Sequence, residues 1–267
     1  MVAQTPPLSD GPLVVVAERD GVVTLTLNRP AQFNALSGAL LGELQAALDA
    51  VAASPTARVV ILAGAGKAFC AGHDLKEMRA HPDRAYHKAL FDQCSRMMLT
   101  LIRLPQPVIA RVHGIATAAG CQLVSMCDLA VAADGARFAV SGVNVGLFCS
   151  TPSVGLARNI GRKEAMEMLL TGEFIDAATA RERGLVNRVV PAAELDAEVD
   201  KLVQSILRKT PVAIRAGKQA FYRQIELGID GAYALASEVM ADNMMACDAA
   251  EGIDAFIAKR APKWTGK

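Results

Sequence analysis

The chain has 267 residues, 52% of them hydrophobic, which suits one large domain, alone or with a helical appendage. Its 28 basic and 27 acidic residues leave a formal net charge of +1, so we expect neither a nucleic-acid footprint nor a basic membrane-binding patch. The opening residues MVAQTPPLSD lack the basic and apolar regions of a secretory signal, and the uncharged spans 112–127 and 138–157 are too short or too polar to cross a membrane.

Six cysteines, at positions 70, 94, 121, 127, 149 and 247, form no CxxC pair and show no zinc-ligand spacing to a histidine. Scattered cysteines in a chain without a secretion signal are expected to be reduced and buried. We therefore expect no metal site and a reducing compartment, the cytoplasm.

The chain begins with apolar strands. Residues 13–19 and 22–27 are joined by Asp20-Gly21, a dipeptide typical of two-residue hairpin turns. A helix runs from its cap Ser37 to Ser54, with apolar residues at helical spacing, and a buried strand follows at 59–63.

The next segment is a glycine-rich loop, GAGKAFCAGHD, followed by a polar helical region through His87 and an amphipathic helix over 88–102. A buried strand at 107–112 leads into a second loop of small residues, HGIATAAG, and short strands are expected at 129–133 and 137–140.

From Thr151 the pattern is almost wholly helical, and residues 232–245 carry apolar side chains on more than one face. The repeated strand and helix units up to about residue 190 predict an α/β core. We divide the chain into a flexible N-terminus (1–12), a core (13–191) and a helical oligomerisation region (192–267).

Two nucleotide-binding patterns are excluded. GAGKAF lacks the first glycine of a P-loop, since Ile61 stands there, and Ala68 stands where Ser or Thr should follow the lysine. No GxGxxG motif lies between a strand and a helix, so no dinucleotide fingerprint is present.

The two loops of small residues each follow a buried strand, where α/β proteins commonly build their sites. Backbone N–H groups at helix starts favour negative charge, and one from each loop could converge on a carbonyl oxygen as an oxyanion hole. Judged by spacing alone, the two loops are slightly more typical of tightly packed turns with no catalytic role than of an oxyanion hole.

The residues of both loops resemble a known family. KAFCAGHDLKEM (67–78) resembles the KAFxAGxDxKEM segment of the enoyl-CoA hydratase/isomerase (crotonase) superfamily, and HGIATAAGCQLVSMCDLAVAA (113–133) resembles its GxxxGGGxELAxxCDxxxA segment. Further matching segments lie at 29–36, 137–147, 165–191 and 251–264, so the resemblance covers about residues 13–264. The run GLFCSTPSVGLAR (146–158) is similar to a subgroup, the enoyl-CoA hydratase domain-containing proteins.

This resemblance implies a spiral core of ββα units with a helical C-terminal trimerisation region, assembled as a homotrimer or a dimer of trimers. It implies an acyl-CoA ligand, with coenzyme A as part of the substrate and no tightly bound cofactor. The backbone N–H groups of His73 and Ala119 should form the oxyanion hole. Further residues should bind the substrate, the last two often from a neighbouring subunit: Ala31, Gln32, Phe33, Ala71, Asp74, Leu75, Lys76, Phe256 and Lys259.

The sequence departs from the family where its hydratases carry two glutamates that move protons. Gln122 stands at the first position and Gly142 at the second. An amide does not titrate near neutral pH and glycine has no side chain, whereas general acid–base catalysis contributes roughly 100- to 10,000-fold in rate.

Several side chains could replace the glutamates. His73 could act as a base, Ser141 or Asn144 could orient a water, and Cys121 or Cys149 could be nucleophiles. Plainer roles are favoured for the ionisable candidates: a side chain pointing to solvent or to the channel rim for His73, and an N-cap for Asp74.

The remaining histidines also have plain roles. His113 is expected to satisfy a hydrogen bond at a strand end, and His81 and His87 to be surface residues flanking a loop, HPDRAYH, that could cover the pocket.

Three functions stay open: an enolate-stabilising acyl-CoA enzyme with weak hydratase activity, a decarboxylase that needs only the oxyanion hole, and a non-catalytic acyl-CoA binder.

Overall fold

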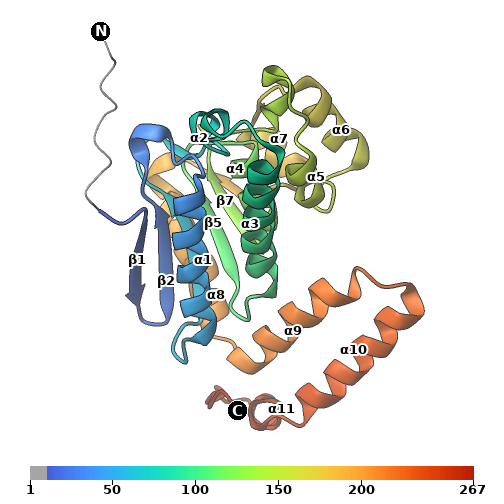
Figure 1. The fold of residues 1–267 in the computed structure, drawn as a ribbon. Helices are drawn as coiled ribbons and strands as arrows, with labels where there is room; N and C mark the ends of the chain where they lie inside the picture. The colour runs from blue at the N-terminus through green and yellow to red at the C-terminus, as the bar shows by residue number, and fades with distance from the viewer. Residues whose placement is uncertain (1–10) are drawn as a thin grey trace.

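The computed structural model describes residues 11–267 and is built on two sheets (Figure 1). The larger has the order β1-β2-β3-β5-β7-β10, with β1 (Val14–Arg19), β2 (Val22–Leu27), β3 (Val59–Gly64), β5 (Val108–Val112), β7 (Leu129–Ala133) and β10 (Arg188–Val190). The smaller has the order β4-β6-β8-β9, with β4 (Ala68–Cys70), β6 (Ile115–Thr117), β8 (Arg137–Ala139) and β9 (Ile175–Asp176).

Successive strands alternate between the two sheets, which gives the chain a spiral course. β3, β5 and β7 lie in the larger sheet, and the strands that follow them, β4, β6 and β8, lie in the smaller one. Strands of successive turns pair in parallel within each sheet. The expected α/β core of repeated ββα units is therefore present. Each turn of the spiral passes the same edge of the larger sheet.

β1 and β2 form the hairpin that Asp20-Gly21 predicts. Arg19 pairs with Val22, and φ is 52° at Asp20 and 79° at Gly21. Two positive φ angles in a two-residue turn define type I′ geometry, which matches the twist of the flanking strands.

Helices cover both faces of the larger sheet (Figure 1). Ser37 caps the first of them as predicted, accepting a hydrogen bond from Leu40 N–H at 3.2 Å. The helices are α1 (Gly38–Ala53), α2 (Leu75–Ala80), α3 (Arg84–Arg103), α4 (Ala119–Met126), α5 (Ser150–Leu156), α6 (Arg162–Thr171), α7 (Ala177–Glu182), α8 (Leu195–Leu207), α9 (Pro211–Gln224), α10 (Ile229–Met244) and α11 (Cys247–Ile257), with 3₁₀ turns at Pro30–Gln32, Ser141–Val145 and Ala192–Glu194.

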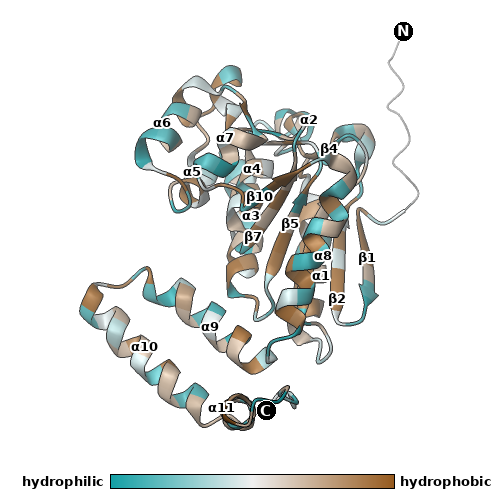
Figure 2. Ribbon diagram, turned by 180° about the vertical axis from the view of Figure 1, so that it is seen from behind, coloured by the Kyte–Doolittle hydropathy of each residue, from teal (hydrophilic) through white to brown (hydrophobic). Residues whose placement is uncertain are grey.

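The C-terminal helices α9, α10 and α11 extend from the core as an arm (Figure 1), and apolar residues occur along its length (Figure 2). In α10 only Ala232 is buried, whereas Tyr233 and Met240 are 69% and 66% exposed. Large apolar side chains of this helix are therefore exposed to solvent in the single chain. Exposed apolar surface of this kind is typical of an interface with another chain.

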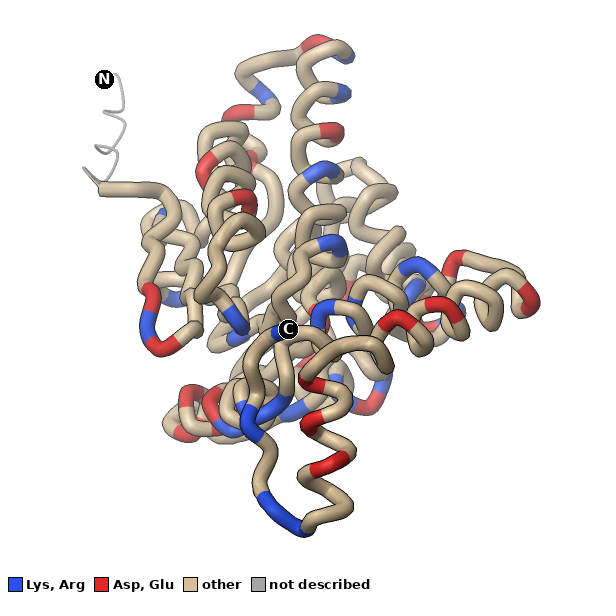
Figure 3. Tube along the Cα trace, turned by 90° about the horizontal axis from the view of Figure 1, so that it is seen from below, with Lys and Arg blue, Asp and Glu red and all other residues tan. Residues whose placement is uncertain are grey.

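Charged residues of both signs are interspersed over the molecule (Figure 3). Within residues 11–267, no helix has the length and apolar character needed to span a bilayer.

Short elements differ from the sequence expectations. The strands β4, β6, β9 and β10 were not predicted, because two or three residues are too few to show a two-residue period. α3 begins at Arg84 rather than residue 88, since the Asp83 carboxylate accepts a hydrogen bond from Tyr86 N–H at 2.8 Å and caps it. Cys247 is exposed, against the expectation of buried cysteines. Of the flexible segment predicted at 1–12, residues 1–10 lie outside the described residues.

Candidate active site

The glycine-rich loop after β3 is held in place by Asn34. This residue is fully buried, and its side-chain amide donates to the carbonyls of Ala65 and Ala68 at 2.9 and 2.8 Å. Its φ of 56° lies in the left-handed region, which asparagine enters more readily than most residues. Asn34 was not among the residues predicted for the site, because its only local signal is an amide within the segment RPAQFNAL.

The end of this loop runs beside Leu36 as a parallel bridge. Leu36 N–H donates to the Gly72 carbonyl at 2.7 Å, and Asp74 N–H donates to the Leu36 carbonyl at 3.1 Å. In a parallel ladder, the residue between two such partners directs its own N–H to the opposite side. The N–H of His73 therefore faces away from Leu36.

The second loop ends at Ala118, whose backbone conformation is unfavourable for alanine. Ala118 has φ 51° and ψ −121°, a conformation that glycine adopts freely and other residues seldom adopt. α4 starts directly afterwards, so the N–H of Ala119 is one of the four that have no acceptor inside the helix. A side chain on Gly120 would collide with the Cys70 carbonyl, so α4 rests directly on β4.

The two loops meet at Gly72, whose φ is 87°. A Cβ atom on Gly72 would lie 2.8 Å from the Cβ of Ala118 and 3.2 Å from the backbone nitrogen of Ala119. Because His73 follows Gly72 directly, its N–H and that of Ala119 lie where the loops touch. Two backbone donors on separate segments can hold a carbonyl oxygen as it gains negative charge.

Gln122 lies in the first turn of α4, close to these donors. The residue is 5% exposed, and its Oε1 atom is buried without a hydrogen-bond partner in residues 11–267. Because a glutamine amide does not titrate near neutral pH, Gln122 cannot act as a general acid or base at this position.

Another part of the chain fills the space beside Gly142, where the resemblance implies the second glutamate of family hydratases. Gly142 N–H donates to Cys149 Sγ at 3.3 Å, and Leu147 N–H donates to the Gly142 carbonyl at 2.9 Å. A Cβ atom on Gly142 would lie 2.7 Å from that sulfur and would collide with the Leu147 carbonyl. Segment 147–149 thus occupies the space where a side chain would start.

The neutral polar candidates already have partners. The Ser141 hydroxyl lies 2.8 Å from that of Thr117, and the Asn144 amide donates to the Gly172 carbonyl at 3.3 Å. Both contacts hold the chain beside Gly142 in place.

Burial sets the ionisation of the cysteines and of His73. It raises the pKa of Cys121 to about 12 and also raises that of Cys149, so neither thiol is activated as a nucleophile. Burial lowers the pKa of His73, which keeps its imidazole neutral at pH 7. The His73 ring is buried against Phe91 rather than at an open rim.

The other predicted histidine and carboxylate roles are present. His113 Nε2 lies 3.0 Å from the Gly66 carbonyl at a strand end, and Asp74 caps α2 by accepting from Lys76 N–H at 3.1 Å. Asp74 also pairs with Arg29 at 3.0 Å, so its carboxylate already has partners. His81 is exposed as expected, whereas His87 is half-buried.

The residues expected to bind coenzyme A are only partly brought together. Phe33 and Leu75 are 53% and 52% exposed beside the first loop, near Ala31, Gln32, Ala71 and Lys76 in the chain. Phe256, by contrast, is 85% exposed on α11, at the other end of the molecule from α2 and α4 (Figure 1), and Lys259 follows that helix. Within one chain these two residues do not reach the loops.

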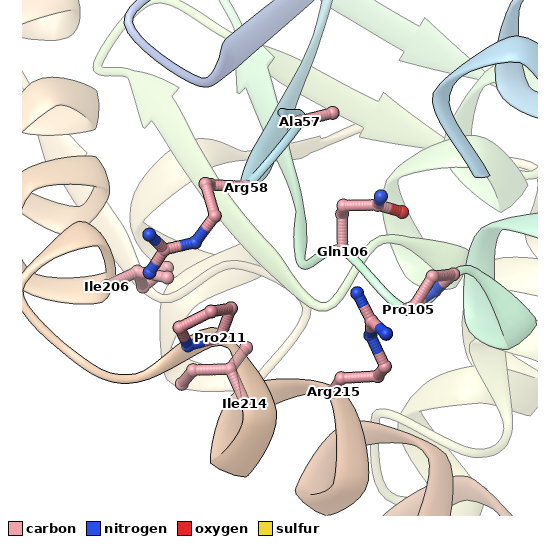
Figure 4. A pocket seen from close by; sticks show the side chains of 8 residues that line it. All are labelled: Ala57, Arg58, Pro105, Gln106, Ile206, Pro211, Ile214 and Arg215. Carbon is pink, nitrogen blue, oxygen red and sulfur yellow. The ribbon is translucent and has the colours of Figure 1, made fainter. Parts of the chain in front are cut away.

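Two hollows elsewhere contain none of the predicted site residues. A groove of about 720 Å³ lies between the larger sheet and α8, and its walls include Arg19 and Asp200. A cavity of about 20 Å³ lies where the core meets α9 (Figure 4), with Gln106, Arg58 and Arg215 around it. The cavity has room for about one water molecule.

Comparison with known proteins identifies the family. Residues 17–267 match the family model described as enoyl-CoA hydratase/isomerase. The chain belongs to the enoyl-CoA hydratase/isomerase family. The recognised resemblance and the crotonase-like fold are thereby confirmed, and the chain is related to proteins that act on acyl-CoA.

Relatives in this enoyl-CoA hydratase/isomerase family cover nearly the whole chain. Enoyl-CoA hydratase domain-containing protein 3, mitochondrial, of Xenopus laevis is 46% identical over 97% of this chain and 88% of its own length. The 2,3-dehydroadipyl-CoA hydratase of Escherichia coli is 36% identical over 95% of this chain and 99% of its own.

Solved structures of the family agree with this fold. An enoyl-CoA hydratase of Mycobacterium smegmatis has a TM-score of 0.94 at 59% identity, covering 95% of this chain and 99% of its own. Human enoyl Coenzyme A hydratase domain-containing protein 3 has a TM-score of 0.92 at 45% identity, covering 94% of this chain and all of its own.

The expectation of a cytoplasmic protein is wrong. Several family relatives at 44–46% identity are named mitochondrial proteins. Reduced cysteines and the lack of a secretory-signal pattern do not separate one reducing compartment from another.

Proposed function

We propose that the chain binds an acyl-CoA thioester and stabilises the enolate of its acyl group with the backbone N–H groups of His73 and Ala119. The observation that carries this proposal is the meeting of the two loops at Gly72, where a Cβ atom would lie 3.2 Å from the nitrogen of Ala119. Removing one such donor typically costs about 100- to 1,000-fold in rate. No metal or tightly bound cofactor is part of this proposal.

The bound thioester would lie along Ala31–Phe33 and Ala71–Lys76, with Phe256 and Lys259 supplied by a second subunit. The uncovered apolar surface of α10 and the distance of α11 from the loops support a trimer or a dimer of trimers. A chain assembled in this way would complete its coenzyme A channel only as an oligomer. No nucleic-acid or membrane partner is proposed.

Hydration of an enoyl-CoA should be weak. Gln122 cannot exchange a proton near neutral pH, and the space beside Gly142 is occupied by the Cys149 sulfur. A general acid–base pair contributes roughly 100- to 10,000-fold, so crotonyl-CoA hydration should fall short of a two-glutamate hydratase by at least about 100-fold.

One experiment tests the proposal and compares reactions. A panel of acyl-CoAs is incubated with the protein in deuterated water and analysed by mass spectrometry, which reports hydration, isomerisation, α-exchange, decarboxylation and hydrolysis together. Saturable binding with slow α-exchange is expected. Hydration within about tenfold of a two-glutamate hydratase would contradict the weak-hydratase assignment.

Decarboxylation of a malonyl-type CoA is the second candidate. Cleavage of the carbon–carboxylate bond releases CO₂ and leaves its electron pair on the thioester as an enolate, which takes a proton from solvent. The reaction needs the two N–H donors but no protein base, which fits the occupied space at Gly142. CO₂ release would support it, and no release from several malonyl thioesters would exclude it. Saturable binding without any product would instead assign the chain as a non-catalytic acyl-CoA binder.

A further inference from the structure

Two histidines from different elements lie against one phenylalanine beside the proposed oxyanion hole. The ring of His73 meets that of Phe91 edge-on, with 5.4 Å between centroids. The ring of His87, one turn earlier on α3, stacks on the same phenylalanine at 6.4 Å. Phe91 therefore brings the two imidazoles into one cluster.

Three of the four ring nitrogens of this cluster are buried without a hydrogen-bond partner in the part of the chain that the structure describes. Both nitrogens of His73 and Nδ1 of His87 are buried without a hydrogen bond to any group in residues 11–267. The Leu36 carbonyl, which accepts from Asp74 N–H, lies near the His73 ring but outside hydrogen-bonding geometry. Buried polar atoms in native proteins nearly always have a partner, so these nitrogens indicate a polar group that is bound from outside the chain.

Polar groups next to the cluster do have hydrogen-bond partners, so the lack of partners is confined to the imidazole nitrogens of the cluster. Tyr86, adjacent to His87 in the chain, donates its hydroxyl to the Glu77 carboxylate at 2.9 Å. Glu77 also accepts from Gly38 N–H at 3.1 Å. The packing of α2 and α3 thus satisfies polar atoms next to the cluster and leaves both nitrogens of His73 and Nδ1 of His87 without a partner among the described residues.

We infer that His73, His87 and Phe91 form a subsite for a hydroxyl group on the acyl chain of the bound thioester. This inference rests on the proposed function, because His73 also carries one of the proposed N–H donors. A neutral imidazole has one N–H donor and one nitrogen acceptor, and a hydroxyl group both donates and accepts. Burial lowers the pKa of His73 and so favours this neutral form. The Phe91 ring supplies an apolar surface for the methylene groups of the chain.

The test compares six-carbon esters by isothermal titration calorimetry: hexanoyl-CoA, hexanoyl-CoA hydroxylated at the fourth or fifth carbon, and adipyl-CoA. We expect one hydroxylated ester to bind the wild-type protein about tenfold more tightly than hexanoyl-CoA, as one or two hydrogen bonds would give. His87→Leu should remove this preference, and His87→Asn, whose amide donates and accepts, should retain part of it. His81→Leu, a change of an exposed histidine outside the cluster, should leave the preference intact.

Each outcome decides the inference. Equal binding of hexanoyl-CoA and the hydroxylated esters would overturn it, as would a preference that survives in both His73→Leu and His87→Leu. A preference for adipyl-CoA would overturn the hydroxyl assignment in favour of a carboxylate. Absence of binding by every ester would instead contradict the proposed function. His87→Leu should also raise the melting temperature, since it removes an unpaired buried nitrogen, so an unfolded variant would count against the inference.

Discussion

The backbone N–H of Gly142 donates a hydrogen bond to the sulfur of Cys149 at 3.3 Å, and this contact closes the position where the sequence resemblance implies that family hydratases carry a glutamate. The space where a side chain at this position would start is occupied by residues 147–149. Restoring the carboxylate alone would not restore the space that it needs.

We therefore expect Gly142→Glu to leave crotonyl-CoA hydration at the wild-type level. Its Cβ would lie 2.7 Å from Cys149 Sγ, and overpacking of this kind lowers the free energy of unfolding by about 1–3 kcal/mol. Thermal unfolding and hydration assays check both points. Gln122→Glu is the matched control, because Gln and Glu have nearly the same shape and no backbone change is needed. A large gain of hydration in Gly142→Glu alone would contradict the packing argument.

Ala118→Gly should relieve strain at the start of α4. A non-glycine residue at φ 51° and ψ −121° costs of order 1–3 kcal/mol, whereas the extra freedom of glycine in the unfolded chain costs about 0.4–1 kcal/mol. The free energy of unfolding should therefore rise by about 1 kcal/mol in urea denaturation. Ala119→Gly, one residue later and inside the helix, should lower it by about 0.5–1 kcal/mol. Equal losses in the two variants would show that Ala118 is unstrained.

Lys218→Met should loosen the attachment of the C-terminal arm. Lys218, on α9, donates to the carbonyls of Leu101 and Gln106 at 2.8 and 2.9 Å and to Asp128 at 2.6 Å. Removing one partner of a buried ion pair costs about 3–5 kcal/mol, because the other charge remains buried. Chemical denaturation should show this loss, and Lys218→Met combined with Asp128→Asn should recover part of it.

Lys201→Met is the control for this prediction. Lys201 pairs with Glu198 at 2.7 Å but is 67% exposed, and an exposed ion pair contributes about 0–1 kcal/mol. A similar loss in the two lysine variants would mean that burial does not decide the strength of the Lys218 contact.

Asp248 should make the stability of the arm depend on pH in the acid range. Burial opposes its ionisation, but hydrogen bonds from Thr210, Thr265 and Gly266 outweigh that effect and hold its pKa at about 2, below the ordinary 3.8. A lowered pKa in the folded state adds stability above the unfolded-state pKa, and that stability is lost as pH falls through the folded-state value.

The wild-type protein should therefore lose this contribution between about pH 4 and pH 2. Melting temperatures measured across that interval should fall more steeply for the wild type than for Asp248→Asn. Parallel curves for the two proteins would show that Asp248 does not contribute to acid unfolding.

Turn and helix-cap preferences predicted the parts of the structure that depend on residues close together in the sequence. Asp20-Gly21 indicated its turn because both residues tolerate positive φ, and Ser37 and Asp74 indicated helix starts because a side-chain cap acts within three residues. The family motifs then supplied the order of the ββα units, which no local rule contains.

Features that depend on contacts across the fold could not be predicted. The sulfur of Cys149 reaches Gly142 only because the chain turns back between them, and nothing in the two residue types indicates that contact. The burial of the His73 ring against Phe91, where an open channel rim was expected, depends on the packing of α3 beside the loop. The left-handed Ala118 is likewise imposed by tertiary packing against the local preference of alanine.

The two N–H groups where the loops meet belong to the main chain, and a peptide dipole is the same whichever side chain is attached to it. His73 and Ala119 can therefore stand at these positions without altering the direction of the donors, provided that Gly72 and Gly120 keep the two segments in contact. In a protein that binds its ligand through backbone N–H groups, substitution of the reactive side chains need not weaken ligand binding. Loss of the residues for one reaction then leaves a binding site on which a different reaction can be built.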